Sequence, residues 1–406
     1  MKGERMCILK GKEIVIGVTG GIAIFKAPEL VRQLVKLGAK VQVVMTRNAQ
    51  EFVTPLTFQV LSGNPVTTQL FRLLSESKIG HVALADRADM IVIAPATANI
   101  LGKIANGIGD DMLSTLVMAA RSPVLLAPAM NYRMWANSVV QRNVKHLKQD
   151  GYHLIEPGFG DLACGEEGKG RMAEVEEILE EMEEVLTRKD LQGERILVTA
   201  GPTQEPLDPV RFISNRSSGK MGHALAHVAQ KRGAEVILIS GPTSLTPPRK
   251  VKFIKVGTAL EMREATLREF QTATVVIKAA AVADYRPTVK EERKFKKSDS
   301  SITLALEKNP DILKELGKNK GSRILIGFAA ETERLIKNAQ DKLKAKNLDL
   351  IIANDVSQES SGFSSDTNQV KIIDQEGTIE DLPLLPKGEV AELILNRLKE
   401  MRKRKG

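Results

Sequence analysis

Short apolar runs alternate with longer amphipathic segments along the whole chain. In the first half these runs are apolar throughout, which is typical of strands buried on both faces of a sheet. The segment Ile22–Gly38, between the first two runs, has helical spacing and ends at a glycine. We expect parallel strands covered by helices on both faces, at Glu13–Gly20, Lys40–Thr46, Ala88–Thr97 and Ser122–Met130.

An acidic helical segment, Ala173–Asp190, separates this pattern from a second one of the same kind. We place a domain boundary there, with one domain at residues 1–189 and the other at residues 190–406. The second domain repeats the alternation but not the sequence. Its expected strands are Arg195–Gly201, Ala234–Gly241, Thr272–Asp284, Arg323–Thr332 and Leu348–Val356, followed by a hairpin turning at Gln375–Gly377 and a final helix from Lys387. The predicted fold class is α/β, with two doubly wound domains in tandem.

Length and composition agree with two globular domains and narrow the function. A chain of 406 residues is too long for one core. The net charge of +9 favours anionic ligands, whereas 4% aromatic residues leave few stacking platforms for single-stranded nucleic acid. Two cysteines make no disulfide framework, and the chain shows neither a signal peptide nor an apolar run of about 18 residues. We expect a cytoplasmic protein that binds neither nucleic acid nor membranes.

Small and hydroxyl-bearing residues follow three strands of the first domain. In a parallel sheet the carboxyl ends of the strands share one edge, where ligands bind. Glycines there allow a close backbone approach, and helix starts offer free N–H groups to a phosphate. The pattern lacks the dinucleotide fingerprint and fits a mononucleotide better, although a plain tight turn at the first strand remains open. The candidate residues are Thr19, Gly20, Gly21, Thr46, Ala96, Thr97 and Asn99.

Three further residues of the first domain are candidates for chemistry. Asn131 follows a strand, and Met134 and Trp135 beside it are expected to wall an apolar pocket. His81 precedes a short apolar run, where a structural histidine is the common alternative. Cys164 lies among glycines and charges, in the segment DLACGEEGKGRM, where an incidental loop cysteine is the alternative.

The strings TGGIA, PATAN, PAMNYRMW and ACGEEGKGRM occur in the order found in flavin-dependent phosphopantothenoylcysteine decarboxylases, which this half resembles. The resemblance implies FMN at the strand-end residues named above. It implies that His81 takes part in oxidation and decarboxylation, that Asn131 binds the substrate carboxylate, and that Cys164 donates a proton to the enethiolate product. The family usually has PASANT where this chain has PATANI. Ile100 therefore stands where the family has a threonine, and the threonine hydroxyl is missing.

The second domain also gathers polar residues and lysines at its strand ends. Asp284 follows a strand that ends in small residues, and Lys294 belongs to a basic cluster. The segment KNPDIL reads as a capped helix start. Lys342 and Lys346 are four residues apart and are expected to share one helix face. Such a lysine pair commonly lies on a solvated surface. Together with the small-residue strand ends, however, it is consistent with a triphosphate site.

The strings GPTQEPLDPVRFISNRSSGKMG, AAVADY, NPDI, GFAAET and ANDV resemble CTP-dependent phosphopantothenate–cysteine ligases. The resemblance implies a Rossmann-like domain that binds CTP and Mg²⁺, with metal ligands unknown. Asn215 would process the acyl-cytidylate, with Arg211 near the same intermediate. The implied nucleotide and substrate contacts are Lys278, Ala279, Ala280, Ala281, Asp284, Lys294, Asn309, Pro310, Asp311, Ile312, Phe328, Lys342 and Lys346.

Together the two halves resemble the bifunctional coenzyme A biosynthesis proteins of bacteria. The resemblance implies small-molecule substrates, namely 4′-phosphopantothenate, cysteine and CTP, and a homo-oligomer of up to twelve subunits. Three alternatives stay open at this point. They are a flavoprotein decarboxylase acting on another cysteine-containing substrate, a non-catalytic regulatory flavoprotein and, on charge alone, a nucleic-acid-binding module.

Overall fold

The structure is a computed structural model that describes residues 6–70, 80–161, 165–294, 303–331, 334–355 and 365–405. The chain folds into two compact units, Arg5–Thr187 and Arg188–Gly406.

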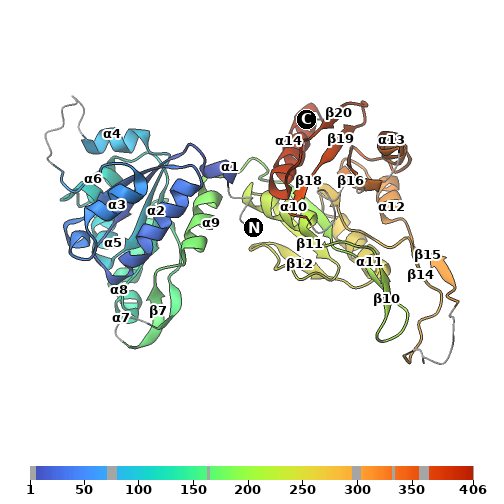
Figure 1. Ribbon diagram of the computed structural model, residues 1–406, viewed down its shortest axis with the longest axis horizontal. Coiled ribbons are helices and arrows are strands. Elements are labelled where there is room, and N and C mark those ends of the chain that lie inside the picture. Colours follow the sequence, from blue (N-terminus) through green and yellow to red (C-terminus); the bar gives the residue numbers. More distant parts are fainter. Residues whose placement is uncertain are drawn as a thin grey trace. The chain divides into compact units, whose positions relative to one another are not determined.

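A five-stranded parallel sheet forms the centre of the first unit, with the order β2–β1–β3–β4–β5. Figure 1 labels the helices that surround it. The four predicted strands are confirmed, and their apolar residues are almost all buried, as expected for strands covered on both faces. A short fifth strand, which the sequence did not reveal, extends one edge. The strands are β1 (Glu13–Val18), β2 (Lys40–Met45), β3 (Met90–Ala96), β4 (Val124–Pro128) and β5 (His153–Leu154).

Helices cover both faces of this sheet. Helices α2, α3 and α9 pack into one apolar cluster, and α4, α5, α6 and α8 pack into the cluster on the other face. The predicted helix Ile22–Gly38 begins with a 3-10 turn, η1, before the regular helix α2, which has a proline in its first turn. The helices are α1 (Met6–Leu9), η1 (Ile22–Lys26), α2 (Ala27–Lys36), η2 (Arg47–Glu51), α3 (Pro55–Ser62), α4 (Gly80–Arg87), α5 (Ala98–Ala105), α6 (Met112–Ala119), α7 (Tyr132–Ala136), α8 (Ser138–Gln149) and α9 (Val175–Leu186).

The second unit contains an eight-stranded sheet with the order β12–β11–β8–β13–β16–β17–β19–β20. Its first six strands are parallel, and the predicted hairpin β19–β20 adds two antiparallel strands at one edge. The strands are β8 (Arg195–Ala200), β11 (Glu235–Ser240), β12 (Lys252–Lys255), β13 (Val275–Lys278), β16 (Ile324–Glu331), β17 (Leu350–Asp355), β19 (Val370–Asp374) and β20 (Ile379–Asp381).

Successive residues along these strands face opposite layers of helices. On β13, Val275 and Ile277 pack with α10 and α14, whereas Val276 packs with α11, α12 and α13. The helices are α10 (Lys220–Lys231), α11 (Ala259–Phe270), α12 (Ile312–Lys318), α13 (Leu335–Ala345) and α14 (Lys387–Lys405). None of the described helices is both long enough and apolar enough to span a bilayer.

Small antiparallel hairpins that the hydrophobic pattern did not predict complete both units. The first unit has β6 (Gly158–Asp161) paired with β7 (Glu167–Arg171). The second unit has β9 (Gln204–Pro206) with β10 (Phe212–Ser214), β14 (Tyr285–Pro287) with β15 (Leu306–Lys308), and β18 (Thr367–Asn368) with β21 (Leu385–Pro386).

A nearly buried cluster of charges fastens the last helix to the start of the second unit. The Asp190 carboxylate accepts hydrogen bonds from Arg232 at 2.9 and 3.1 Å and from the Lys399 ammonium on α14 at 2.7 Å. Arg232 also donates to Asn396 on the same helix, at 2.9 Å. Burial by itself would raise the pKa of Asp190, but the bonds from Arg232 and Lys399 lower it to about 2.

We predict that Asp190→Asn destabilises the second unit by about 2 kcal/mol at neutral pH, because the lowered pKa favours the folded state by roughly that amount. Urea unfolding of the full chain at pH 7 measures the loss. In the wild type the contribution of Asp190 is complete above about pH 4 and is lost as the pH falls towards 2, since its folded pKa lies below its unfolded pKa. The control is Glu376→Gln, which removes the largely exposed pair with Arg404 and is expected to cost less than about 0.5 kcal/mol. Equal losses for the two variants would contradict the prediction.

Candidate functional sites

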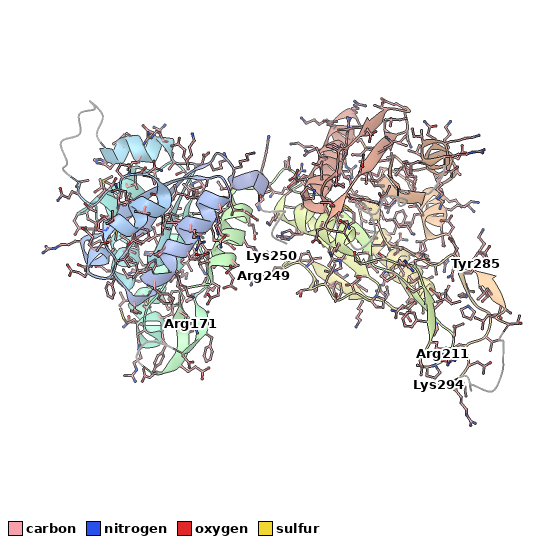
Figure 2. The ribbon with its side chains drawn as sticks, in the orientation of Figure 1. Arg171, Arg211, Arg249, Lys250, Tyr285 and Lys294 are labelled. Carbon is pink, nitrogen blue, oxygen red and sulfur yellow. The ribbon has the colours of Figure 1, made fainter. Side chains whose placement is uncertain are left out.

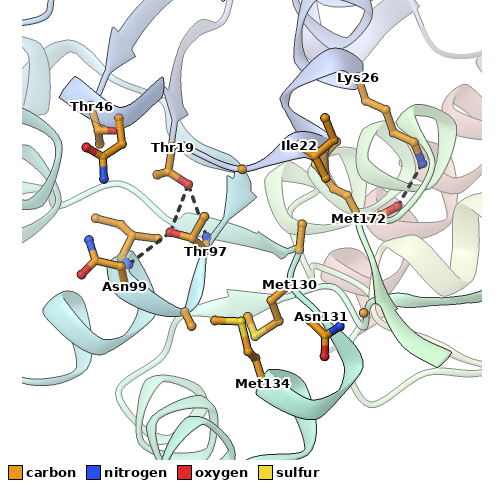
Figure 3. Close-up of a pocket in the computed structure, with 18 of the residues that line it drawn as sticks. Thr19, Ile22, Lys26, Thr46, Thr97, Asn99, Met130, Asn131, Met134 and Met172 are labelled. Carbon is orange, nitrogen blue, oxygen red and sulfur yellow. Dashed lines mark hydrogen bonds between the residues drawn. The ribbon is translucent and has the colours of Figure 1, made fainter. Parts of the chain in front are cut away.

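A large pocket opens at the carboxyl ends of the strands in the first unit (Figure 3). Its volume is about 1200 Å³, which is more than a mononucleotide alone needs. Of the seven strand-end candidates, six line the pocket, and Ala96 is fully buried in β3 behind them. The six are Thr19, Gly20, Gly21, Thr46, Thr97 and Asn99.

Two threonine hydroxyls join adjacent strand ends at the floor of this pocket. The Thr19 hydroxyl donates to the Pro95 carbonyl at 2.6 Å and accepts from the Thr97 backbone N–H at 3.3 Å. Thr97 is the N-cap of α5, and its own hydroxyl accepts from the Ile100 N–H at 3.5 Å (Figure 3). The start of α5 therefore borders the pocket, and a helix start of this kind can offer N–H groups to an anion. Ile100 is buried, so its side chain serves the core of this chain.

Gly20 allows the loop after β1 to touch the loop after β2. A Cβ atom on this residue would lie 2.6 Å from the Cβ of Asn48 and 2.7 Å from its carbonyl group, so any side chain would separate the loops. Around this contact the pocket has a polar end and an apolar wall, made by Ile22, Met130 and Met134 among others. This division fits FMN, which has a polar phosphate end and a flat, largely apolar ring system.

Asn131 enters the pocket from the loop after β4. Its carboxamide oxygen caps α7 by accepting from the Arg133 N–H at 2.8 Å. Met134 also lines the pocket, but Trp135 does not. The expectation that Trp135 forms a pocket wall was wrong, because on the short helix α7 it points into the core with Leu126 and Leu147.

Cys164 lies outside the described residues, but the strands that precede and follow it border the pocket. Asp161 at the end of β6 lines the pocket, as do Gly170 and Arg171 of β7. Arg171 is therefore the cation of this hairpin that faces the pocket, whereas Lys169 pairs with Glu156 at 2.8 Å. The role expected for Cys164 stays a prediction.

His81 does not line the pocket of its own chain. It lies in the first turn of α4, and its Nδ1 atom is buried without a hydrogen-bond partner in the described structure. An unpaired buried nitrogen is costly for a purely structural histidine. The catalytic role expected for His81 stays a prediction.

Sequence reasoning missed the charged residues at the rim of this pocket. Lys103 bridges Asp110 and Asp111 at 2.7 and 2.9 Å, and all three line the pocket. Burial alone would raise the pKa of Asp111, but hydrogen bonds from the Ser114 N–H and Lys103 lower it. The capping box of Asp111 and Ser114 is a signal for the start of α6, though not for a pocket. Arg47 and Asn48 also line the pocket, and their position directly after β2 was the available clue.

In the second unit the candidate residues gather around the carboxyl end of β13. Lys278 is its last residue and pairs in register with Gly327, which precedes Phe328 on β16. Ala281 bridges to Pro202, so the loop after β8 meets the segment after β13. Burial, and next the Lys346 ammonium, lower the pKa of Lys278 to about 8, against an opposing effect from Asp311 and Asp284.

The predicted capped helix start at Asn309–Ile312 is confirmed and lies beside Lys278. Asp311 caps α12 by accepting from the Lys314 N–H at 3.1 Å, and its other oxygen pairs with Lys346 at 2.9 Å. Asn309 is buried and donates to the Ala283 carbonyl at 2.9 Å. It also donates its backbone N–H to the Asp284 carbonyl at 2.8 Å. Asn309 thus fixes the loop that carries Asp284.

Asn215 is tied to the same loop from the other side. Its carboxamide donates to the Val282 carbonyl at 3.0 Å and more weakly to Ala281. Arg211 pairs with Asp208 at 3.5 Å in the β9–β10 hairpin. Figure 2 labels Arg211 and the exposed Lys294. The segments that carry them are joined by a hydrogen bond of 2.9 Å from the Glu291 N–H to the Leu207 carbonyl.

The remaining candidates differ in their placement. Ile312 is buried in the core, and Ala279, Ala280, Pro310 and Phe328 are half-buried at the strand ends. Lys342 is exposed on α13, and Lys346 is the C-cap of that helix, where its N–H donates to the Lys342 carbonyl at 3.0 Å, so the two lysines lie one helical turn apart as expected. The helix ends because Asn347 has a left-handed backbone, with φ 52°. Within the described ranges, no group of three or more His, Cys, Asp or Glu side chains is arranged to hold a metal ion.

Comparison with known families agrees with the division into two units. Residues 4–187 match the family described as "Flavoprotein". Residues 191–401 match the family described as "DNA/pantothenate metabolism flavoprotein C-terminal domain". The second match alone covers more than half of the chain.

Full-length relatives share both halves. The chain is 49% identical over 403 residues to the coenzyme A biosynthesis bifunctional protein CoaBC of Bacillus subtilis, covering 98% of this chain and 99% of the relative. It is 44% identical to the CoaBC protein of Escherichia coli K12, covering 96% and 97%. A crystal structure of the C-terminal domain of a CoaBC protein is 46% identical, covers 53% of this chain and 99% of that chain, and has a TM-score of 0.47. The identity along both halves shows that the chain belongs to the family of coenzyme A biosynthesis bifunctional proteins.

Proposed function

We propose that the chain catalyses two successive steps of coenzyme A biosynthesis, one in each unit. The second unit joins 4′-phosphopantothenate to cysteine at the expense of CTP. The first unit then decarboxylates the product, 4′-phosphopantothenoylcysteine, to 4′-phosphopantetheine with FMN. The observation that carries the proposal is the full-length likeness to the CoaBC proteins, together with a site at the strand ends of each unit.

In the ligase reaction the substrate carboxylate attacks the α-phosphate of CTP, which forms an acyl-cytidylate and releases pyrophosphate. The amine of cysteine then attacks the acyl carbon and displaces CMP. In this proposal Lys278 and Lys346 hold the anionic nucleotide. Asn215, whose carboxamide donates to the Val282 carbonyl, acts on the acyl group. We propose Mg²⁺ as the partner of the triphosphate. Mg²⁺ commonly binds phosphate oxygens, one or two carboxylates and water, so it does not need a cage of protein ligands.

For the decarboxylation, we propose that Thr19, Thr97 and the start of α5 hold FMN in the first pocket. When bound, FMN would supply the two-electron oxidation that turns the cysteine end of the substrate into an electron sink for loss of CO₂, and would return the same two electrons as a hydride to the enethiolate. Asn131 orients the carboxylate that leaves. The enethiolate product then needs a proton, which the Cys164 thiol donates. Arg171 beside the pocket favours the thiolate that remains.

We further propose that the first unit works as a homo-oligomer. Ile22 and Phe25 line the pocket while 60% and 65% exposed, so the pocket has an apolar rim that a second subunit can cover. Such an assembly also explains His81, which lies outside its own pocket and is available to a neighbouring one. A reducing compartment, the cytoplasm, keeps the catalytic thiol free.

Of the alternative functions, a decarboxylase acting on another cysteine-containing substrate accounts for the first pocket but not for the ligase family match of the second unit. A regulatory flavoprotein does not require His81, Asn131 and Cys164, all of which the sequence retains. The two-step proposal uses both sites.

We predict that the purified protein converts 4′-phosphopantothenate, cysteine and Mg²⁺·CTP into 4′-phosphopantetheine, CMP, pyrophosphate and CO₂, as followed by mass spectrometry. Cys164→Ser should still release CMP but stall after oxidation or decarboxylation. Asn215→Ala should release at least about tenfold less CMP, yet still decarboxylate added phosphopantothenoylcysteine, because it alters only the second unit.

These two variants serve as controls for each other. If Cys164→Ser formed phosphopantetheine at the wild-type rate, only the proposed role of the Cys164 thiol would be contradicted. Absence of CMP from the wild-type reaction would contradict the ligase assignment.

We predict that Thr19→Val lowers the flavin content of the purified protein at least about tenfold, because it removes the hydroxyl that joins β1, β3 and α5 at the pocket floor. The measurement is visible absorbance per mole of protein, with unfolding temperature recorded in parallel. Thr57→Val, an exposed threonine on α3 outside the pocket, is the matched control and should keep the flavin. Full flavin content in Thr19→Val would place the cofactor elsewhere.

A further inference from the structure

Lys278 is an unusual lysine because it closes a buried strand. Its neighbour Ile277 is fully buried, and Lys278 itself is half-buried on the face of the sheet that α12 and α13 cover. Within the described parts of the chain its ammonium has no hydrogen-bond or ion-pair partner. Holding an ammonium group partly out of water without a partner costs free energy. We therefore expect a ligand to compensate the charge of Lys278.

Charged groups approach Lys278 from each neighbouring segment. Lys346 comes from the end of α13, Asp311 from the start of α12, and Asp284 from the loop after β13. Asp311 is already engaged, since one oxygen caps α12 and the other pairs with Lys346 at 2.9 Å. Asp311 therefore acts on both lysines. The Lys346 ammonium disfavours a second positive charge on Lys278.

This arrangement suits an anion that arrives with several negative charges. A triphosphate would compensate both lysines at once, whereas among the described residues only Lys346 of the two has an ion pair. We propose that Lys278 is a phosphate anchor that takes up a proton when the nucleotide binds. The inference rests on the proposed ligase function and adds to it a coupling between nucleotide affinity and pH.

The size of the coupling follows from the protonation of Lys278 before binding. Burial and Lys346 hold its pKa at about 8, so close to that pH about half of the molecules carry a neutral amine. A bound triphosphate favours the charged amine and raises the pKa again. Binding near pH 8 should then take up about half a proton, and the affinity should fall about tenfold from pH 7 to pH 9.

The experiment is titration calorimetry of the full-length protein with Mg²⁺·CTP alone, in buffers of different ionisation enthalpy. The wild type should show the proton uptake and the tenfold loss of affinity. Lys278→Met should show neither and should bind more weakly at pH 7. Lys278→Arg should bind without proton uptake and keep its affinity at pH 9, since a guanidinium stays charged. Lys337→Met, an exposed lysine on α13, is the matched control and should behave as the wild type.

The outcomes separate this inference from the function on which it rests. If the wild type binds CTP with no proton uptake and with constant affinity between pH 7 and pH 9, the inference is wrong and the ligase function stands. If Lys278→Arg keeps the pH dependence, the proton goes to another group and the inference is likewise wrong. If the wild type does not bind CTP at any pH, the proposed function itself fails.

Discussion

Parallel pairing of buried strands is the constraint on which both sites depend. Neighbouring parallel strands run in one direction, so every connection must cross over the sheet, and the carboxyl ends of the strands meet along one edge. In the first unit this brings together Thr19, Thr46 and Thr97, which lie far apart in sequence. In the second unit it brings Lys278 beside Phe328. No local feature of the sequence holds either set together.

The same constraint explains how much of the structure was predictable. Fully apolar runs identify central strands with little ambiguity, so every strand expected from the pattern is present. The short hairpins could not be predicted, because GFGD and EGKGR of β6 and β7 show no hydrophobic alternation. These two strands are held by backbone pairing and by the close fit of Gly170, where a Cβ would lie 2.2 Å from the Met130 carbonyl oxygen. Contacts of this kind depend on the tertiary structure.

The candidate sites divide in a similar way. Strand-end residues such as Thr19 and Asn131 were predicted to lie in the pocket because their sequence position determines their place on the sheet. Trp135 was not placed correctly by the sequence. A short helix holds it, and which way a short helix turns a side chain depends on what it packs against. The family resemblance implied a role for His81, but it could not show that Trp135 packs in the core.

Net charge gave the least specific information of all. The excess of lysine and arginine suggested anionic ligands, yet many of these cations are engaged within the protein. Arg232 belongs to the cluster with Asp190, and Lys103 is bridged to two carboxylates. What marks a binding site is the balance between a cation and its neighbours, more than the number of cations. Lys278 meets that criterion because it has no ion-pair partner among the described residues while Asp311 pairs with Lys346, and this property follows from the ends of β13, α12 and α13 meeting at one place.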